Sequence, residues 1–196
     1  MTLRKGTPIV VLVGPPGAGK STIGRRLARS LNTTLIDSDA LIEQEFGMPC
    51  GEVFAKIGEP TFREVEERNV AEALGYDAVV SLGGGTVLSE ATRQLLDAQT
   101  VCWLDIAPEE GVRRTQREGH RPVLDPAEPG GDATEHYRAL LEERRPLYQE
   151  VASYRMRTDR RAPQQVVAEI LGLLEAQDGE HPVTPTTAHK IEHPGP

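Results

Sequence analysis

The fold is decided by one stretch near the N-terminus, Ile9 to Ser21, which reads IVVLVGPPGAGKS. Its five β-forming residues, Ile9 to Val13, predict a strand that is buried on both faces. The loop that follows matches the Walker A pattern GxxxxGK[ST], and the apolar residues after Ser21 repeat at helical spacing. In a strand, glycine loop and helix of this kind, backbone N–H groups and the helix N-terminus surround phosphates. The sequence therefore predicts a nucleoside triphosphate site.

The phosphates of that nucleotide are expected to meet the loop and the first helical turn. Lys20 is placed to reach the β- and γ-phosphate oxygens, and the Ser21 hydroxyl to hold Mg²⁺. A glycine-rich turn that contains Lys-Ser by chance is the alternative, and the strand and helix on either side disfavour it. The expected nucleotide-binding residues of this segment are Gly17, Ala18, Gly19, Lys20, Ser21 and Thr22.

The composition limits the partners and the location of the protein. With 196 residues and a net charge of −8, the chain lacks the basic excess that nucleic acids and anionic membranes attract. We therefore expect a small-molecule ligand, no nucleic-acid partner and no membrane partner. Cys50 and Cys102 have no metal-binding spacing, which indicates reduced thiols. No apolar run reaches the ~18 residues of a membrane span, and we expect a cytoplasmic protein.

Predicted strands alternate with predicted helices along the chain. This alternation predicts an α/β fold, a doubly wound three-layer α/β/α sandwich in which helices cover both faces of a five-stranded parallel sheet. One domain is expected over residues 1–177, followed by a disordered tail over 178–196, where hydrophobic periodicity ends. The strands are expected at 9–13, 33–36, 78–82, 100–104 and 154–158.

Two acids, Asp37 and Asp39, directly follow the second predicted strand. Ligands of open parallel sheets lie beyond the carboxyl ends of the strands, so these acids are expected beside the phosphate loop. Residues two apart in an extended segment point the same way, which places both carboxylates on one side of the cleft. The third strand ends in glycine and not in an acid, which leaves Asp37 as the candidate to support the metal. Helix capping is the alternative for either acid.

Three further features carry polar groups toward the same edge. Arg63 and Glu66 stand three apart on a helix expected from Pro60, close enough to pair, although a solvated ion pair has the same spacing. The triplet 83–85, all glycine, lets a ligand approach the backbone closely, as would a plain turn. The Pro- and Gly-rich stretch that begins at Arg121 predicts a mobile lid over about 117–133 or else a disordered surface loop. Thr134 is expected to cap the helix that follows.

Taken together, these segments resemble shikimate kinase, a small kinase of the nucleoside-monophosphate-kinase type with a P-loop and a mobile lid. The resemblance covers almost all of residues 9–174 and keeps the family's motif order. It implies transfer of the γ-phosphate of ATP to the 3-hydroxyl of shikimate, on the route to chorismate and the aromatic amino acids. The motifs are Asp37-Ser-Asp39, Gly58-Glu-Pro-Thr-Phe62-Arg63-x-x-Glu66, Leu82-Gly83-Gly84-Gly85, Arg121-Pro122 and Arg144-Arg-Pro-Leu-Tyr148.

The resemblance also implies residue roles. The catalytic set is Lys20, Asp39 and Arg121, in which Arg121 is the lid arginine over the transferring phosphate. Mg²⁺ is implied at Ser21 and Asp37, and substrate-binding helices at about 38–75. Arginine forks suit the carboxylate of shikimate and an aspartate suits its hydroxyl groups, which supports the assignment independently. Shikimate is implied at Asp39, Arg63, Gly83, Gly84, Gly85 and Arg144, and adenine at Arg114, Arg161 and Pro163.

Two departures and two rivals qualify the resemblance. The lid segment is longer and richer in Pro and Gly than the family pattern, and the tail after Gln177 has no counterpart in it. Gluconate kinase, of the same fold, is the nearest rival, but its site would not need the Arg63 helix followed by three glycines. A nucleotide-binding regulatory domain without catalysis is the other rival, disfavoured because the groups needed for catalysis are present. We expect a monomer.

Overall fold

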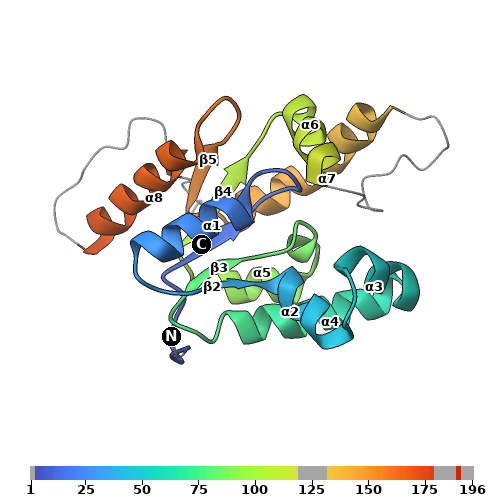
Figure 1. The fold of residues 1–196 in the computed structure, drawn as a ribbon, viewed down its shortest axis with the longest axis horizontal. Coiled ribbons are helices and arrows are strands. Elements are labelled where there is room, and N and C mark those ends of the chain that lie inside the picture. The colour runs from blue at the N-terminus through green and yellow to red at the C-terminus, as the bar shows by residue number, and fades with distance from the viewer. Residues whose placement is uncertain (1–2, 119–131, 179–188, 191–196) are drawn as a thin grey trace.

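A computed structural model describes residues 3–118, 132–178 and 189–190 of the 196. A twisted sheet forms its middle layer, and helices cover both faces (Figure 1). The strand order is β2-β3-β1-β4-β5-β6, and all pairings among the first five strands in this order are parallel. The predicted α/β sandwich with its five-stranded parallel sheet is therefore confirmed. The strands are β1 (Val10–Val13), β2 (Leu35–Asp37), β3 (Val79–Ser81), β4 (Val101–Asp105), β5 (Tyr154–Arg157) and β6 (His189–Lys190).

The helices divide into two layers because each packs one apolar stripe on the sheet. On one face, α1 and α8 pack Leu27 and Ile170 against Leu12 of the central strand. On the other face, α4, α5 and α7 bury Val70, Leu96 and other apolar residues. The helices are α1 (Lys20–Ser30), α2 (Ser38–Phe46), α3 (Cys50–Ile57), α4 (Glu59–Ala73), α5 (Glu90–Leu96), α6 (Pro108–Glu118), α7 (Ala133–Val151) and α8 (Pro163–Asp178), with a 3₁₀ turn, η1 (Thr86–Leu88).

Helices α2, α3 and α4 form a small subassembly at one end of the molecule (Figure 1). Ile42, Val53, Phe62 and Val65 pack into an apolar cluster of their own, separate from the two faces of the sheet. This cluster holds α2 and α4 together, so the polar residues on both helices keep their positions beside the carboxyl ends of β2 and β3.

The tail contributes a strand that the sequence did not predict. His189 and Lys190 pair antiparallel with Arg155 and Tyr154 of β5, so the expectation of an unstructured tail is not met at these two residues. An edge strand presents unpaired backbone N–H and C=O groups. A segment of any composition can form hydrogen bonds with these groups through its own backbone, so no hydrophobic periodicity is needed. The other residues of the tail beyond Asp178 lie outside the described ranges.

The cap of α7 also differs from the prediction. Asp132 is its N-cap, and the Asp132 carboxylate accepts a hydrogen bond of 2.8 Å from the backbone N–H of Thr134. The expected cap, Thr134, lies in the first turn instead. Both residue types cap helices well, and an aspartate two positions earlier reaches the free N–H groups first. Within the described residues, no helix is long and apolar enough to cross a membrane.

Candidate active site

The loop after β1 has the backbone that only glycine adopts easily. Gly14, with φ of +144°, lies against the backbone carbonyl of Leu104, where a β-carbon would collide. Gly19, with φ of +92°, is the N-cap of α1. The Lys20 ammonium donates hydrogen bonds of 2.7 and 3.1 Å to the carbonyls of Gly14 and Pro15. The loop therefore curls around the lysine at a helix N-terminus, as phosphate binding requires.

Asp37 joins this loop to the next strand and also caps a helix. Its Oδ2 accepts a hydrogen bond of 2.8 Å from the Ser21 hydroxyl, and its Oδ1 accepts one of 3.2 Å from the backbone N–H of Asp39. Asp37 is the N-cap of α2. One oxygen of the Asp37 carboxylate therefore faces Ser21, as the metal-site hypothesis expects, and the other oxygen caps α2, as the alternative expects.

Asp39 reaches the same cavity by a route that the sequence argument did not foresee. It lies in the first turn of α2 and not in an extended segment, so the argument from residues two apart in a strand was wrong. The α-helix begins immediately after Asp37 because that residue caps it. Asp39 nevertheless lines a cavity of about 350 Å³ together with Lys20, Ser21 and Asp37. Arg25, one helical turn beyond Ser21, lines this cavity too and was missed.

The glycine triplet after β3 presses against the polar residues of α2 and α4. A β-carbon on Gly83 would collide with a carboxylate oxygen of Asp39, and one on Gly85 would lie 2.5 Å from Nη1 of Arg63. Gly83 also donates its backbone N–H to the buried Ser38 hydroxyl at 2.9 Å. The loop thus needs glycine for close approach, and the alternative of a plain flexible turn does not explain these contacts.

Arg63 is held by two acids of its own helix. Its guanidinium lies 2.6 Å from Glu66 and 3.1 Å from Glu59. Glu66 exposes 5% of its side chain, so the pair with it is not a solvated surface pair. Burial raises the pKa of Glu66 above its usual value, and the Arg63 charge opposes this shift. The pair keeps one guanidinium in a fixed place at the edge of the cavity.

Arg144 approaches the glycine triplet from α7. The residue is 6% exposed, and its Nη1 donates a hydrogen bond of 3.1 Å to the carbonyl of Gly84. Its Nε is buried and has no hydrogen-bond partner among residues 3–118, 132–178 and 189–190. A buried guanidinium with an unused donor is costly unless an acceptor arrives. Arg63 and Arg144 therefore bring two cations to one glycine loop beside the Asp39 carboxylate.

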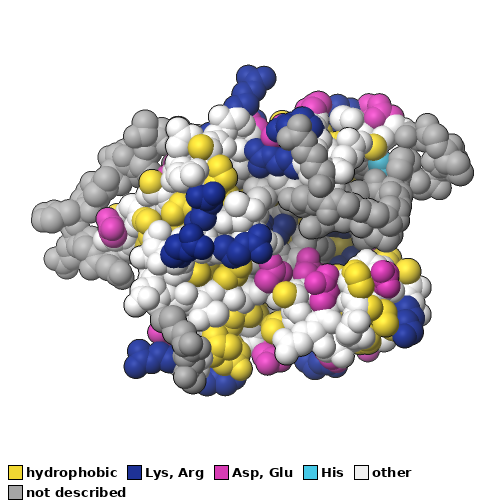
Figure 2. Space-filling view, in the orientation of Figure 1, with side chains coloured by type: hydrophobic (Ala, Val, Ile, Leu, Met, Phe, Trp, Pro, Cys, Tyr) yellow, Lys and Arg dark blue, Asp and Glu magenta, His cyan; other side chains and the backbone are white. Residues whose placement is uncertain are grey.

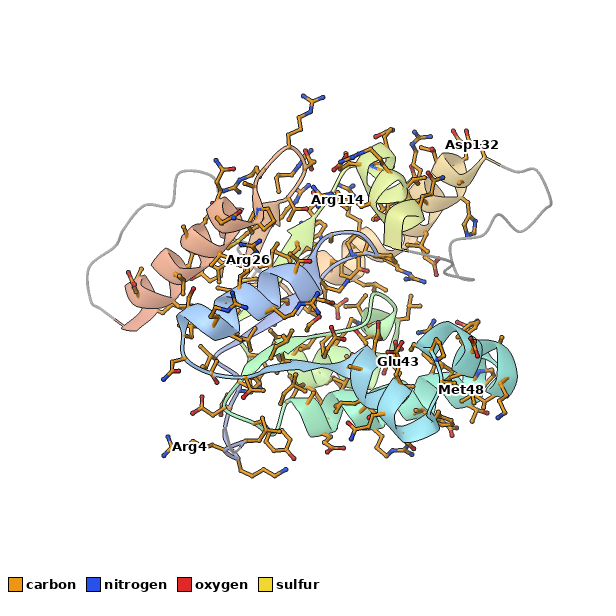
Figure 3. The ribbon with its side chains drawn as sticks, viewed as in Figure 1. Arg4, Arg26, Glu43, Met48, Arg114 and Asp132 are labelled. Atoms are coloured by element: carbon orange, nitrogen blue, oxygen red, sulfur yellow. The ribbon has the colours of Figure 1, made fainter. Side chains whose placement is uncertain are left out.

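A second cavity, of about 400 Å³, lies behind the phosphate loop and contains the predicted adenine residues Arg114, Arg161 and Pro163. Figure 3 shows Arg114 on α6, on the side of that helix nearest the segment after β5. Its guanidinium donates a hydrogen bond of 2.9 Å to the carbonyl of Thr158. Thr158 and Arg160, which also line this cavity, were not predicted, because neither belongs to a motif.

Charge is distributed unevenly around these cavities. Lys and Arg side chains gather over α1, and Asp and Glu side chains lie beside them over the helices near α2 (Figure 2). The predicted lid arginine, Arg121, falls outside the described residues, as does most of the lid segment 117–133. Among the described residues, no group of three or more His, Cys, Asp or Glu side chains could hold a metal alone. A Mg²⁺ ion at Ser21 and Asp37 would take its other ligands from phosphate and water, as is usual for this ion.

Residues 16–175 match a family model described as shikimate kinase. The chain belongs to the shikimate kinase family. A shikimate kinase of Corynebacterium efficiens is 64% identical over 168 residues, which is 86% of this chain and 97% of the relative. One of Mycobacterium avium is 50% identical over 172 residues, 87% of this chain and 96% of that one.

Solved structures of the shikimate kinase family have the same fold. A shikimate kinase from Acinetobacter baumannii, solved in complex with shikimate, has a TM-score of 0.80 and 35% sequence identity. The match covers 88% of this chain and 96% of that one. The enzyme from Bacteroides thetaiotaomicron has a TM-score of 0.74 and 31% identity, over 86% and 98% of the two chains. The predicted family is therefore confirmed.

Proposed function

We propose that this chain transfers the γ-phosphate of ATP to the 3-hydroxyl of shikimate, which gives shikimate 3-phosphate and ADP in aromatic amino acid biosynthesis. Membership of the shikimate kinase family supports the activity. The observation that carries the proposal is the meeting of Asp39, Arg63 and Arg144 around the glycine triplet, next to the phosphate loop. Two cations and one anion complement a ligand with one carboxylate and several hydroxyl groups.

On the acceptor side, Arg63 and Arg144 bind the shikimate carboxylate and Asp39 binds a hydroxyl group. A guanidinium matches a planar carboxylate with two parallel hydrogen bonds, which an ammonium group cannot do. The unused Nε of Arg144 supports this role. Gly83, Gly84 and Gly85 let the ring approach the backbone, since side chains there would fill the space.

On the nucleotide side, the phosphates lie against the N–H groups of Gly17, Ala18, Gly19 and the following helical turn, through Thr22. Lys20 neutralises the β- and γ-oxygens. Ser21 and Asp37 would hold Mg²⁺, which would screen the charge of the phosphates. We assign the γ-phosphate to Arg121, the lid arginine that the resemblance implies and that lies outside the described residues. We assign adenine to the second cavity, which Arg114, Arg161 and Pro163 line.

Phosphoryl transfer asks the protein for position and charge more than for covalent chemistry. The 3-hydroxyl oxygen forms a bond to the γ-phosphorus while the bond from that phosphorus to the ADP oxygen breaks. The hydroxyl proton passes to the Asp39 carboxylate, which aims the hydroxyl in line. Lys20 and Arg121 take up the charge that develops on the transferring group.

The deciding experiment is a coupled ADP-release assay with ATP and Mg²⁺. Shikimate is expected to be phosphorylated at least about two orders of magnitude faster than gluconate, nucleoside monophosphates or water, because unpaired buried groups reject analogues strongly. Equal turnover of gluconate would favour the gluconate kinase rival. Nucleotide binding without turnover of any acceptor would favour a regulatory domain.

The proposal also covers setting and assembly. Both cysteines are free thiols, Cys102 is buried, and burial raises its pKa to about 12, which suits a reducing cytoplasm. We propose a monomer, since the acceptor groups and the phosphate loop all come from one chain.

Asp37→Asn is expected to weaken the response to Mg²⁺. Asparagine caps a helix as well as aspartate does, so α2 should remain intact while the charge beside Ser21 is lost. We expect the Mg²⁺ concentration at half-maximal rate to rise about tenfold, as for loss of one charged contact. Asp97→Asn, which removes the same charge from an exposed position, is the control. A magnesium titration that superimposes on that of Asp97→Asn would remove Asp37 from the metal site.

Gly85→Ala is expected to raise the KM for shikimate about tenfold with little change in the melting temperature. Gly85 has φ of −97°, which alanine adopts readily, so the added methyl group acts by displacing the Arg63 guanidinium. Gly172→Ala in α8 is the control, because apart from the backbone of its own helix no described atom lies within 4 Å of the new methyl group. It should leave the KM unchanged. An unaltered KM in Gly85→Ala would mean that Arg63 does not bind the acceptor from this position.

A further inference from the structure

Two buried tyrosines of α7 each hold one loop of the site. The hydroxyl of Tyr137 donates a hydrogen bond of 2.6 Å to the carbonyl of Pro16, in the phosphate loop. The hydroxyl of Tyr148 donates one of 2.6 Å to the carbonyl of Gly84, in the glycine triplet. Tyr137 is 1% exposed and Tyr148 is 0% exposed. One helix therefore contacts both the nucleotide loop and the acceptor loop.

The spacing of the tyrosines places both on one side of α7. A spacing of eleven residues is just over three full turns of an α-helix, so Tyr137 and Tyr148 lie on the same side of α7, about 16 Å apart along its axis. Arg144 lies one turn before Tyr148, on the same side, and donates to the same Gly84 carbonyl. Helix α7 is continuous from Ala133 to Val151, with Pro146 inside it, so one helix carries all three anchor residues.

The two loops also touch each other directly. A β-carbon on Gly84 would lie 3.0 Å from Cδ of Pro16, so the glycine backbone packs against the proline ring. This contact and the two tyrosine hydrogen bonds form a closed frame that runs from α7 to Pro16, across to Gly84 and back to α7. A change at either tyrosine loosens the frame on one side.

The tyrosine rings are themselves fixed in place. Tyr148 stacks on Trp103 of β4, with ring centroids 5.9 Å apart and an angle of 22° between planes. Burial raises the pKa of the Tyr148 hydroxyl, so the group stays protonated and remains a donor. The Tyr137 ring lies against Gly111 of α6, where a side chain would collide with it. Each hydroxyl is thus held at its carbonyl by packing around the whole ring.

We propose that Tyr137 and Tyr148 are positioning residues that fix the distance between the γ-phosphate and the acceptor hydroxyl through α7. The inference rests on the proposed function, since it takes the phosphate loop as the ATP site and the glycine triplet as the shikimate site. Reacting atoms must come within ~3–3.5 Å, and a displacement of about 1 Å can cost 10²-fold in rate. Neither hydroxyl touches a reacting group, so each acts through the loop that it holds.

The test uses Tyr137→Phe, Tyr148→Phe and the double variant in steady-state assays with both substrates varied. Tyr148→Phe should raise the KM for shikimate about tenfold and change the KM for ATP less than about twofold. Tyr137→Phe should raise the KM for ATP about tenfold and change the KM for shikimate less than about twofold. Both should lower kcat. The kcat of the double variant should be no lower than that of the slower single variant, because either change already opens the frame.

Three further measurements separate positioning from simple packing. Trp103 is the only tryptophan of the chain and stacks on Tyr148, so an unshifted emission maximum in Tyr148→Phe shows that the ring is still in place. Tyr154→Phe is the control, because the Tyr154 hydroxyl accepts a hydrogen bond from the Gln177 side chain at 3.2 Å, away from both loops. This variant should leave both KM values unchanged. Melting temperatures report the loss of stability in each variant.

The outcomes are distinct. Lower melting temperatures with both KM values unchanged would make the tyrosines ordinary core residues and overturn the proposal. Equal shifts of both KM values in each variant would also overturn it. Calorimetric titration of the unmutated chain with shikimate and with ATP tests the underlying assignment. Failure of the unmutated chain to bind either ligand would refute the proposed function, whereas normal binding with unchanged variants would refute only the positioning role.

Discussion

Asp39→Asn is expected to lower kcat by about 10²–10⁴ while nucleotide binding and the fold persist, the usual range for a positioned acid–base group. Asp39 lies in the first turn of α2, lines the cavity with Lys20 and Ser21, and presses against Gly83. Asparagine keeps the shape and a hydrogen bond to the acceptor but cannot accept its proton. The loss should therefore appear in kcat and much less in the KM for ATP.

The measurement is a shikimate-dependent rate at several Mg²⁺ concentrations, with ATP binding followed separately. Asp37→Asn is the matched variant, since it removes the same charge two residues earlier. The defect of Asp39→Asn should persist at saturating Mg²⁺, whereas that of Asp37→Asn should be largely recovered there. Near-normal turnover of Asp39→Asn with a lowered melting temperature would assign Asp39 a structural role, and the proton acceptor would have to be another group.

The fold was predictable because its signals are local. Five β-forming residues before a glycine loop, and apolar residues at helical spacing after it, specify β1 and α1 without reference to the rest of the chain. The strand β6 was not, because two residues of a tail pair with β5 through backbone groups that any sequence provides. The exact start of α2 was not predictable either, since Asp37 and Asp39 are both of a residue type that favours the N-cap position.

The site was predictable where a motif carries the chemistry, as for Lys20 and Arg63, and not where contacts join distant segments. Arg25 lines the phosphate cavity only because α1 turns it beside Ser21. Tyr137 lies 121 residues from Pro16 in sequence, and no sequence pattern predicts the hydrogen bond between them. Such residues resemble ordinary helix or core residues in a single sequence, and only the fold brings them to the loops.

Arg144 differs from the other cations of the site in its burial. It is 6% exposed and donates to the Gly84 carbonyl at 3.1 Å, and its buried Nε has no partner within the part of the chain that the structure describes. A guanidinium with a free donor directed away from solvent is stabilised when a carboxylate arrives, because the hydrogen bond is charge-assisted and little water competes for it. Arg145, the next residue, is only half-buried and offers a comparison in the same helix.

Arg144→Lys is therefore expected to raise the KM for shikimate about 10²-fold, the cost of losing a hydrogen bond between charged groups in a dry site. Lysine keeps the positive charge but lacks the planar fork, so it cannot present two parallel donors to the carboxylate while it also donates to Gly84. The KM for ATP should stay within about twofold, since the phosphate loop retains its own contacts. Arg145→Lys, assayed beside it, should leave both values unchanged. Equal KM values for shikimate in the two variants would show that the charge of Arg144, and not its fork, recognises the acceptor. A raised KM for ATP in Arg144→Lys would show that the substitution disturbs the phosphate loop through Gly84 and Pro16.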